Sequence, residues 1–449
     1  MKSACMIAGT NSGSGKTTFS MGIMAAMTKR GIRVRGFKTG PDYIDPMFHK
    51  KVTNRNSYNL DTWMIEDSYL KYTFRTAMEN SDIGIVEGVM GLFDGHGTTS
   101  NEGSSSHLSE VLNLPIILVV DARGKSRSIA AEILGYISFE KNTKIAGILL
   151  NRISSQKHYE YMKEIIEHYT NLKCYGYLEN LSELSLKERH LGLVPVEEDL
   201  DFDKKIESLV LSIEKTVNLD SIINDFKINS ESIKIPDKIL KLKNRYKGKK
   251  IAIAWDEAFN FYYSSNLDLL EYAGVELIKF SPIRDFRLPR DIDGLYLGGG
   301  FPEVFASSLE QNFSMRKDIF DQLENGLPTY AECGGFMYLT KSITLLNENK
   351  FEMIGFLDTN AYMTKRLQRF GYAFVDISSK YKIKAHEFHH SKVDPEVQNA
   401  YYNLYKTKNN EVLRTWQDGW YKKHTLAAYA HLNFLSNIDV LMWLLNQCK

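Results

Sequence analysis

Through the first half of the chain, short apolar runs alternate with longer stretches whose apolar residues recur at helical spacing. Continuous apolar runs bounded by turn residues indicate buried strands, and a period of about 3.6 residues indicates helices. The alternation predicts βαβ units, a mostly parallel sheet and ligands at the carboxyl ends of its strands. The predicted strands are 4–8, 34–38, 83–87, 116–121 and 145–151, and the predicted helices lie near 15–30, 66–79, 104–112, 125–138 and 155–169.

A second α/β pattern begins near Lys249, with predicted strands at 251–255, 275–280 and 294–297 and a predicted helix at 264–273. The residues between the two patterns carry charged runs and amphipathic pieces, and charged runs are usually solvated. A length of 449 residues also favours two domains. We therefore expect a first domain at 1–195, a charged linker at 196–248 and a second domain at 249–449.

The overall composition limits the kinds of partner that the chain is expected to bind. With 25% charged residues, 43% hydrophobic residues and a formal net charge of +1, it has no electrostatic footprint for nucleic acid or an anionic membrane. No apolar run approaches the roughly 20 residues of a membrane span, and no cleavable signal is visible. The four cysteines are scattered without disulfide or metal-ligand spacing. These features predict a cytoplasmic protein and leave its oligomeric state open.

The turn between the first predicted strand and helix reads Gly-Thr-Asn-Ser-Gly-Ser-Gly-Lys-Thr-Thr from Gly9 to Thr18. Such a turn presents backbone N–H groups and the positive end of a helix to an anion. Gly9 lies six residues before Gly15, one more than in the usual phosphate loop, and an ordinary helix-capping turn is the alternative. We predict a nucleoside triphosphate site formed by Asn11, Ser12, Gly13, Ser14, Gly15, Lys16, Thr17 and Thr18.

Carboxylates follow two of the other predicted strands. Asp45 lies in a loop after the second strand, and Glu87 ends the third. Together with the hydroxyl of Thr17, they would give Mg²⁺ the oxygen ligands that it prefers alongside phosphate and water. The alternative for Asp45 is a turn residue before Pro46. We predict that Thr17, Asp45 and Glu87 hold Mg²⁺.

Cys333 lies in a glycine-rich turn between a predicted strand and a helical pattern. A turn of this kind exposes a nucleophile, and the helix N-terminus favours its thiolate. Gly299, Gly300 and Gly334 are candidate backbone donors to an oxyanion. Sequence distance does not choose a base among His386, His389, His390 and His431, and a buried structural cysteine is the alternative reading.

Several longer motifs together resemble the cobyrinic acid a,c-diamide synthase family, in order and over nearly the whole chain. They are Phe37 to Pro46 with His49, Glu87 to Gly95, Glu188 to Pro195, Ala258 to Tyr263, Gly298 to Glu303, Ala331 to Tyr338, and His386 to His389.

The resemblance implies an α/β fold in which an N-terminal P-loop NTPase domain similar to dethiobiotin synthetase precedes a class I, triad-type glutamine amidotransferase domain. It implies that Cys333 is the nucleophile and that His431 raises its nucleophilicity. Triad enzymes usually carry an orienting glutamate two residues after the histidine, but this chain has Asn433 there and so resembles a Cys–His dyad. Asn11 replaces the signature lysine of the related partitioning ATPases.

The implied activity is ATP-dependent, glutamine-hydrolysing amidation of the a- and c-acetate groups of cobyrinic acid, a corrinoid tetrapyrrole, through acyl phosphates. One ATP and one glutamine are consumed for each amide, and Lys38, Asp42 and Tyr43 are candidate substrate contacts. Hydrogenobyrinic acid or a nickel sirohydrochlorin is the alternative macrocycle. A regulatory or partitioning ATPase with an inert appended domain is the alternative of a different class.

Overall fold

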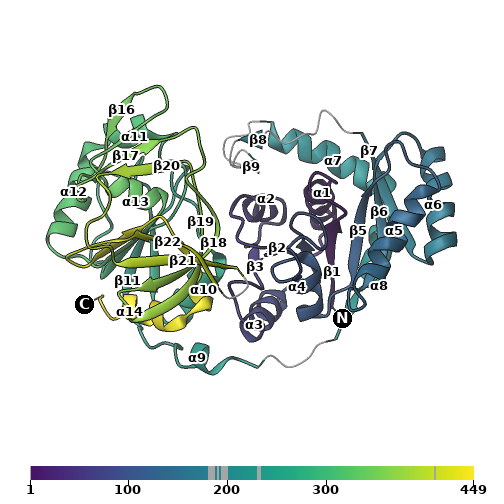
Figure 1. The fold of residues 1–449 in the computed structure, drawn as a ribbon, viewed down its shortest axis with the longest axis horizontal. Coiled ribbons are helices and arrows are strands. Elements are labelled where there is room, and N and C mark those ends of the chain that lie inside the picture. The colour runs from purple at the N-terminus through teal and green to yellow at the C-terminus, as the bar shows by residue number, and fades with distance from the viewer. Residues whose placement is uncertain are drawn as a thin grey trace. The chain divides into compact units, whose positions relative to one another are not determined.

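The computed structural model describes residues 2–180, 201–229, 234–408 and 411–448, together with the backbone of two short strands, β8 (Glu188–Arg189) and β9 (Gly192–Leu193). The chain divides into two compact units, Met1–Lys234 and Ile235–Lys449, whose elements are labelled in Figure 1. The other residues of the motif at 188–195, and residues 196–200 of the expected linker, lie outside the described residues.

The first unit is built on an eight-stranded sheet with the order β3-β2-β4-β1-β5-β6-β7, in which β10 pairs antiparallel with β1. All other pairs in this sheet are parallel, as the alternating pattern predicts. The five predicted strands are found, and β3 and β7 extend the sheet at its edges. The strands are β1 (Lys2–Gly9), β2 (Val34–Thr39), β3 (Tyr58–Leu60), β4 (Ile83–Glu87), β5 (Ile116–Asp121), β6 (Ile145–Ile153), β7 (Lys173–Glu179) and β10 (Lys227–Ile228).

The predicted helices of the first unit are also found, and α1 packs against α2 and α7. The described helices are α1 (Lys16–Lys29), α2 (Ile44–Thr53), α3 (Asp67–Met78), α4 (Ser105–Leu112), α5 (Ser128–Phe139), α6 (Gln156–Thr170), α7 (Phe202–Thr216) and α8 (Leu219–Asp225). The buried faces of α1, α7 and α8 share one apolar core with the central strands β1, β4 and β5.

Helix α2 begins inside the segment that the sequence indicates as a loop. Asp42 Oδ1 accepts the amides of Ile44 and Asp45 at 2.7 and 3.2 Å, which satisfies two donors of the first helical turn. Pro46 lies in that same turn, where its missing N–H costs no helical hydrogen bond. Asp45 is therefore a helical residue held beside the sheet and not a turn residue.

Part of the expected linker belongs to the first unit. Helix α7 packs so closely on α1 that a Cβ on Gly22 would lie 2.8 Å from Ile213 and 2.9 Å from Leu209. Because the charged residues of α7 alternate with a buried apolar stripe, the segment is a surface helix and not a solvated connection. Residues 202–228 thus complete the first unit.

The second unit contains a six-stranded sheet with the order β12-β11-β13-β14-β24-β23, parallel except for its last strand. Its strands are β11 (Lys250–Ala254), β12 (Glu276–Phe280), β13 (Gly294–Leu297), β14 (Thr329–Glu332), β23 (Trp420–Lys422) and β24 (Thr425–Ala428). The helices of this unit are α9 (Asp237–Leu240), α10 (Ser264–Tyr272), α11 (Ala306–Gln311), α12 (Phe313–Glu324), α13 (Gly334–Leu339) and α14 (Ile438–Leu445), with a short 3-10 helix at Phe434–Ser436.

Two smaller sheets complete the second unit (Figure 1). One has the order β22-β21-β18-β19-β25 and is antiparallel, and the other has the order β16-β15-β17-β20. Their strands are β15 (Ser342–Thr344), β16 (Lys350–Glu352), β17 (Asn360–Met363), β18 (Arg369–Ile377), β19 (Tyr381–His389), β20 (Ser391–Asp394), β21 (Tyr402–Lys408), β22 (Glu411–Asp418) and β25 (His431–Leu432).

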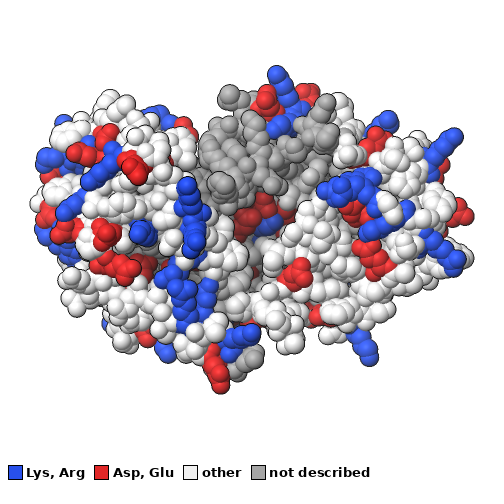
Figure 2. All heavy atoms as spheres, turned by 45° about the horizontal axis from the view of Figure 1, so that its top comes forward, with Lys and Arg blue, Asp and Glu red and all other residues white. Residues whose placement is uncertain are grey.

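Basic and acidic side chains are interspersed over the face of both units in Figure 2, with one denser run of Lys and Arg on the second unit. Within the described residues, none of the helices combines the length and apolarity that crossing a membrane requires.

Candidate active sites

The predicted nucleotide loop connects β1 to α1 and turns through two left-handed glycines. Gly13 has φ 75° and Gly15 has φ 107°. A Cβ on Gly15 would lie 2.2 Å from the amide nitrogen of Asn151, so this position requires glycine. Asn151 Nδ2 and Arg152 Nη2, at the end of β6, donate to the carbonyls of Ser14 and Gly13 at 2.8 and 2.9 Å. Because C=O and N–H point in opposite directions across a trans peptide, these bonds turn the following amides away from β6.

Lys16 and Thr17 begin α1 and extend from this loop. Lys16 Nζ donates to the carbonyl of Asn11 at 3.1 Å, and burial followed by the nearby charge of Lys38 lowers the pKa of Lys16 to about 8. Thr17 Oγ1 donates to Glu87 Oε1 at 2.6 Å. Among the remaining predicted contacts, Ser14 is buried, Gly15 and Thr18 are half-buried, and Asn11, Ser12 and Gly13 are exposed.

Asp45 and Glu87, which lie far apart in the sequence, share the ammonium group of Lys38. Lys38 Nζ contacts the Asp45 carboxylate and lies 2.9 Å from Glu87 Oε1. Although burial opposes ionisation of Glu87, Lys38 and His49 hold the pKa of this carboxyl below its usual range. Burial and the neighbouring Asp42 raise the pKa of Asp45. One ammonium therefore faces two buried carboxylates that repel each other.

His49 also belongs to this cluster, although the sequence did not predict a role for it. Its Nε2 lies 2.8 Å from Glu87 Oε2, its Nδ1 lies 3.0 Å from Ser57 Oγ, and the side chain is fully buried. A lone histidine on a helix gives no signal of its own, because its partner comes from a different strand. The signal in the sequence was its place in the motif that follows β2.

The predicted substrate contacts Lys38, Asp42 and Tyr43 occupy one short stretch, but their surroundings differ. Lys38 is engaged with Asp45 and Glu87, and Asp42 Oδ1 caps α2. Tyr43 is buried at the start of that helix. Of these three side chains, the half-buried Asp42 is the most accessible.

The oxygen set around Lys38 fits a hard divalent cation. Thr17, Asp45 and Glu87 converge there, and a cation would relieve the repulsion between the two buried carboxylates. Nowhere in the described chain do three or more His, Cys, Asp or Glu side chains form a complete metal cage. Mg²⁺ itself binds through one or two carboxylates and completes its octahedron with phosphate and water.

Cys333 lies at the sharp turn between β14 and α13. Its φ of 46° and ψ of −101° fall outside the regions open to most side chains, so the turn is strained. The backbone on both sides is fixed, because the Cys333 amide donates to Ala428 O at 2.8 Å and the Gly335 amide donates to Gly298 O at 3.0 Å. The thiol is thereby held at the N-terminus of a helix and at the carboxyl edge of the sheet.

The three predicted glycines surround Cys333 and His431. A Cβ on Gly334 would lie 3.0 Å from the Gly300 amide nitrogen, and a Cβ on Gly299 would lie 2.5 Å from His431 Cε1. The close approach of these backbones leaves no room for side chains and brings peptide groups close to Cys333, the predicted nucleophile.

His431, on β25, is the histidine that is hydrogen-bonded to Cys333. Burial alone lowers the pKa of an imidazole, but the Cys333 sulfur and the Glu332 carboxylate outweigh it and raise the pKa of His431 to about 10. His386 pairs with His431 across the strands, and burial lowers its pKa to about 3. His389 stacks on Tyr429 at 3.8 Å, and burial likewise lowers its pKa to about 3. These shifts favour a cationic His431 beside two neutral histidines.

Glu332 was missed by the sequence analysis. Its Oε2 lies 3.3 Å from His431 Nδ1, and its Oε1 accepts the Leu432 amide at 3.1 Å and the Tyr330 hydroxyl at 2.5 Å. It is 1% exposed, so water does not compete for these bonds.

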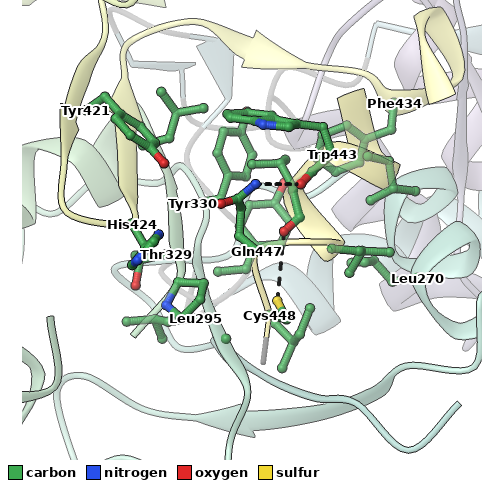
Figure 3. A pocket seen from close by; sticks show the side chains of 18 residues that line it. Leu270, Leu295, Thr329, Tyr330, Tyr421, His424, Phe434, Trp443, Gln447 and Cys448 are labelled. Carbon is green, nitrogen blue, oxygen red and sulfur yellow. Dashed lines mark hydrogen bonds between the residues drawn. The ribbon is translucent and has the colours of Figure 1, made fainter. Parts of the chain in front are cut away.

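An apolar pocket lies elsewhere in the second unit (Figure 3). Its lining includes Gly294, Thr329 and His424, at the amino ends of β13, β14 and β24, together with Trp443 and Cys448 near the C-terminus. Cys333 follows the carboxyl end of β14, so this pocket belongs to the opposite edge of the sheet and contains none of the predicted site residues.

Comparison with known families assigns both units to a class. Residues 5–194 match the CobQ/CobB/MinD/ParA nucleotide binding domain, and residues 250–438 match the CobB/CobQ-like glutamine amidotransferase domain. The fold and the site thus define a two-domain enzyme, a glutamine-dependent carbon–nitrogen ligase, as predicted.

Relatives over the full length narrow the class further. The cobyrinate a,c-diamide synthase of Caldanaerobacter subterraneus is 44% identical over 99% of this chain and 98% of the relative. The enzymes of the same name from Clostridium acetobutylicum and Priestia megaterium are 43% and 38% identical, over 97% and 99% of this chain and 98% and 96% of the relatives. The chain belongs to the cobyrinate a,c-diamide synthase family.

Proposed function

We propose that this chain amidates the a- and c-acetate carboxylates of cobyrinic acid in cobalamin biosynthesis, with glutamine as the nitrogen donor and ATP as the activating substrate. The observation that carries the proposal is the hydrogen-bonded Cys333–His431 pair, in a chain whose other unit holds a phosphate loop beside a buried cluster of Lys38, Asp45 and Glu87. The names of the full-length relatives support the choice of macrocycle.

In the second unit, the Cys333 thiolate attacks the side-chain carboxamide carbon of glutamine. The oxyanion forms beside the peptides of Gly300 and Gly334, and the His431 imidazolium donates its proton to the leaving nitrogen as the C–N bond breaks. Ammonia leaves, and a γ-glutamyl thioester remains on Cys333. Water, deprotonated by His431, then cleaves the thioester to glutamate and regenerates the thiolate.

In the first unit, a carboxylate oxygen of the macrocycle attacks the γ-phosphorus of ATP and ADP leaves. A carboxylate is a poor electrophile, and the acyl phosphate supplies the leaving group that it lacks. Ammonia then attacks the acyl carbon, phosphate departs as the C–O bond breaks, and the amide forms. Phosphoryl transfer depends chiefly on positioning and charge neutralisation, which the loop amides and Lys16 provide.

Thr17, Asp45 and Glu87 are the residues that would hold Mg²⁺, and bound Mg²⁺ would neutralise charge on the β- and γ-phosphates. Before ATP arrives, Lys38 balances part of the charge of Asp45 and Glu87 and keeps both side chains at the edge of the sheet.

An activity panel tests the proposal. The enzyme is incubated with ATP, Mg²⁺, glutamine and, separately, cobyrinic acid, hydrogenobyrinic acid or nickel sirohydrochlorin, and the mass change per amidation is measured. We expect two successive amidations of cobyrinic acid. A clear preference for another macrocycle would change the proposed substrate but not the proposed reaction. ATP hydrolysis without amidation of any macrocycle would favour the partitioning-type ATPase and overturn the proposal.

A further inference from the structure

Asn433 occupies the position at which triad amidotransferases usually carry the orienting glutamate, but its side chain is used elsewhere. Its Oδ1 accepts the Leu435 amide at 3.1 Å and caps the 3-10 helix Phe434–Ser436. The residue two positions after His431 therefore serves the backbone of its own turn.

We propose that Glu332, the residue immediately before the nucleophile, orients His431 and completes a Cys333–His431–Glu332 triad. This inference rests on the proposed glutaminase function of Cys333. The position is unusual, because one strand end supplies both the orienting carboxylate and the nucleophile, whereas the histidine comes from β25.

The geometry fixes the imidazole by one of its two nitrogens. With Glu332 Oε2 3.3 Å from Nδ1, the proton on Nδ1 is donated to the carboxylate, and Nε2 is left to exchange a proton with the thiol. The carboxylate is itself held, since the Leu432 amide and the Tyr330 hydroxyl both donate to Oε1. Glu332 and His431 are 1% and 2% exposed, so the attraction between them is weakly screened.

The isosteric substitution Glu332→Gln distinguishes an orienting role for Glu332 from a merely structural one. Glu332→Gln retains an oxygen that accepts from Leu432 and Tyr330, so the fold around β25 is kept. The amide NH₂ then faces His431 Nδ1 and requires it to be an acceptor, which places the ring proton on Nε2. The negative charge that stabilises the imidazolium is also lost.

The experiment compares Glu332→Gln with Glu387→Gln in the full-length protein. Glu387 is an equally buried glutamate of the second unit, and burial raises its pKa to about 8. We measure the pH profile of glutamine hydrolysis and the pH dependence of Cys333 alkylation by iodoacetamide. For Glu332→Gln we expect kcat to fall about 10- to 100-fold and the alkaline limb of both profiles to move to lower pH, because the imidazolium deprotonates more easily. Glu387→Gln should leave both limbs in place.

Glu332→Asp keeps the charge and guards against a folding defect in the Gln variant. It should lose rate through its shorter reach but retain the alkaline limb near the wild-type pH. Unchanged kcat and limb in Glu332→Gln, or the same limb shift in the Gln and Asp variants, would overturn the inference. If the Glu332 inference fails but Cys333→Ala abolishes glutamine hydrolysis, the proposed function still stands. If Cys333→Ala hydrolyses glutamine normally, the proposed function itself fails.

Discussion

The two units bury carboxylates at the carboxyl edges of their parallel sheets, but they place different groups beside them. In the first unit, Asp45 and Glu87 share the ammonium of Lys38 and repel each other. In the second unit, the single carboxylate of Glu332 faces the imidazole of His431. Two carboxylates that repel each other suit a site that recruits a cation and phosphates, whereas a carboxylate–imidazole pair suits a site that holds a proton in place. The carboxyl edge of a parallel sheet thus suits a different chemistry in each unit.

The largest effect is expected for Cys333→Ala, which separates the two units functionally. Glutamine-dependent amidation should fall at least about 1,000-fold, because the covalent nucleophile is lost. Amidation supplied with ammonium chloride should persist near the wild-type rate, since the first unit is untouched. Product mass with each nitrogen source is the measurement. Glutamine hydrolysis that survives unchanged would contradict the role of Cys333.

Asp45→Asn is the complementary test, because it alters the first unit and leaves the second unchanged. It removes one of the two carboxylates beside Lys38, which the proposal assigns to Mg²⁺, so ATP-dependent amidation should fall about 100-fold with either nitrogen source. Basal glutamine hydrolysis should stay largely intact. Asp67→Asn is a matched control, because Asp67 is also in the first turn of a helix but is exposed. Equal loss of both activities in Asp45→Asn would refute the division of labour.

Gly299→Ala addresses the packing around the Glu332–His431 pair. The new Cβ would lie 2.5 Å from His431 Cε1, so the imidazole must move away from Cys333. Glutamine hydrolysis should fall about 10-fold, as expected for a catalytic group displaced by a few tenths of an ångström. Ammonia-dependent amidation should be unaffected. Gly135→Ala, with no atom within 4 Å of its new Cβ, is the control, and a wild-type hydrolysis rate in Gly299→Ala would argue against the observed packing.

The smallest effect concerns pH and stability. The pKa of His431 is raised to about 10, so its stabilisation is complete below the unfolded pKa of about 6.5 and is lost as pH rises from there to 10. Burial lowers the pKa of His386 to about 3, so the stability tied to its neutral form is present above about pH 6.5 and lost as pH falls toward 3. Each proton gives a slope of up to about 1.4 kcal/mol per pH unit in the free energy of unfolding.

Chemical denaturation across pH checks this contrast. His431→Asn should flatten the alkaline side of the stability profile, and His386→Asn should flatten the acid side. Tryptophan fluorescence reports mainly on the second unit, which holds Trp255, Trp416, Trp420 and Trp443. Identical profiles for the two variants would show that the histidines do not differ in charge.

Much of the first unit was predictable because its signals are local. The apolar runs ending in Ala8, Lys38 and Glu87 predict neighbouring strand ends, and the loop before α1 follows directly from its glycines and Lys16. The start of α2 was missed, because Asp42 and Pro46 are turn formers as well as residues of a first helical turn. The charge on α7 concealed the apolar stripe that packs on α1.

The candidate site in the second unit was less accessible to sequence reasoning. Cys333 is marked by its glycines, but spacing leaves four histidines equivalent, and the antiparallel pairing of β19 with β25 that distinguishes His386 from His431 is a long-range contact. Glu332 gave no signal, because a glutamate at the end of a strand is common and its partner lies about a hundred residues away. Tertiary pairing, and not local pattern, selects these residues.

The packing of α7 on Gly22 also bears on how the first unit can be produced by itself. The nucleotide-binding family match ends at residue 194, before this helix begins. A fragment cut there would expose the apolar faces of α1 that Leu209 and Ile213 cover, and it would be prone to self-association. A fragment ending at 234 retains α7, α8 and the pairing of β10 with β1. We therefore expect residues 1–234, and not residues 1–194, to express as a folded nucleotide-binding protein.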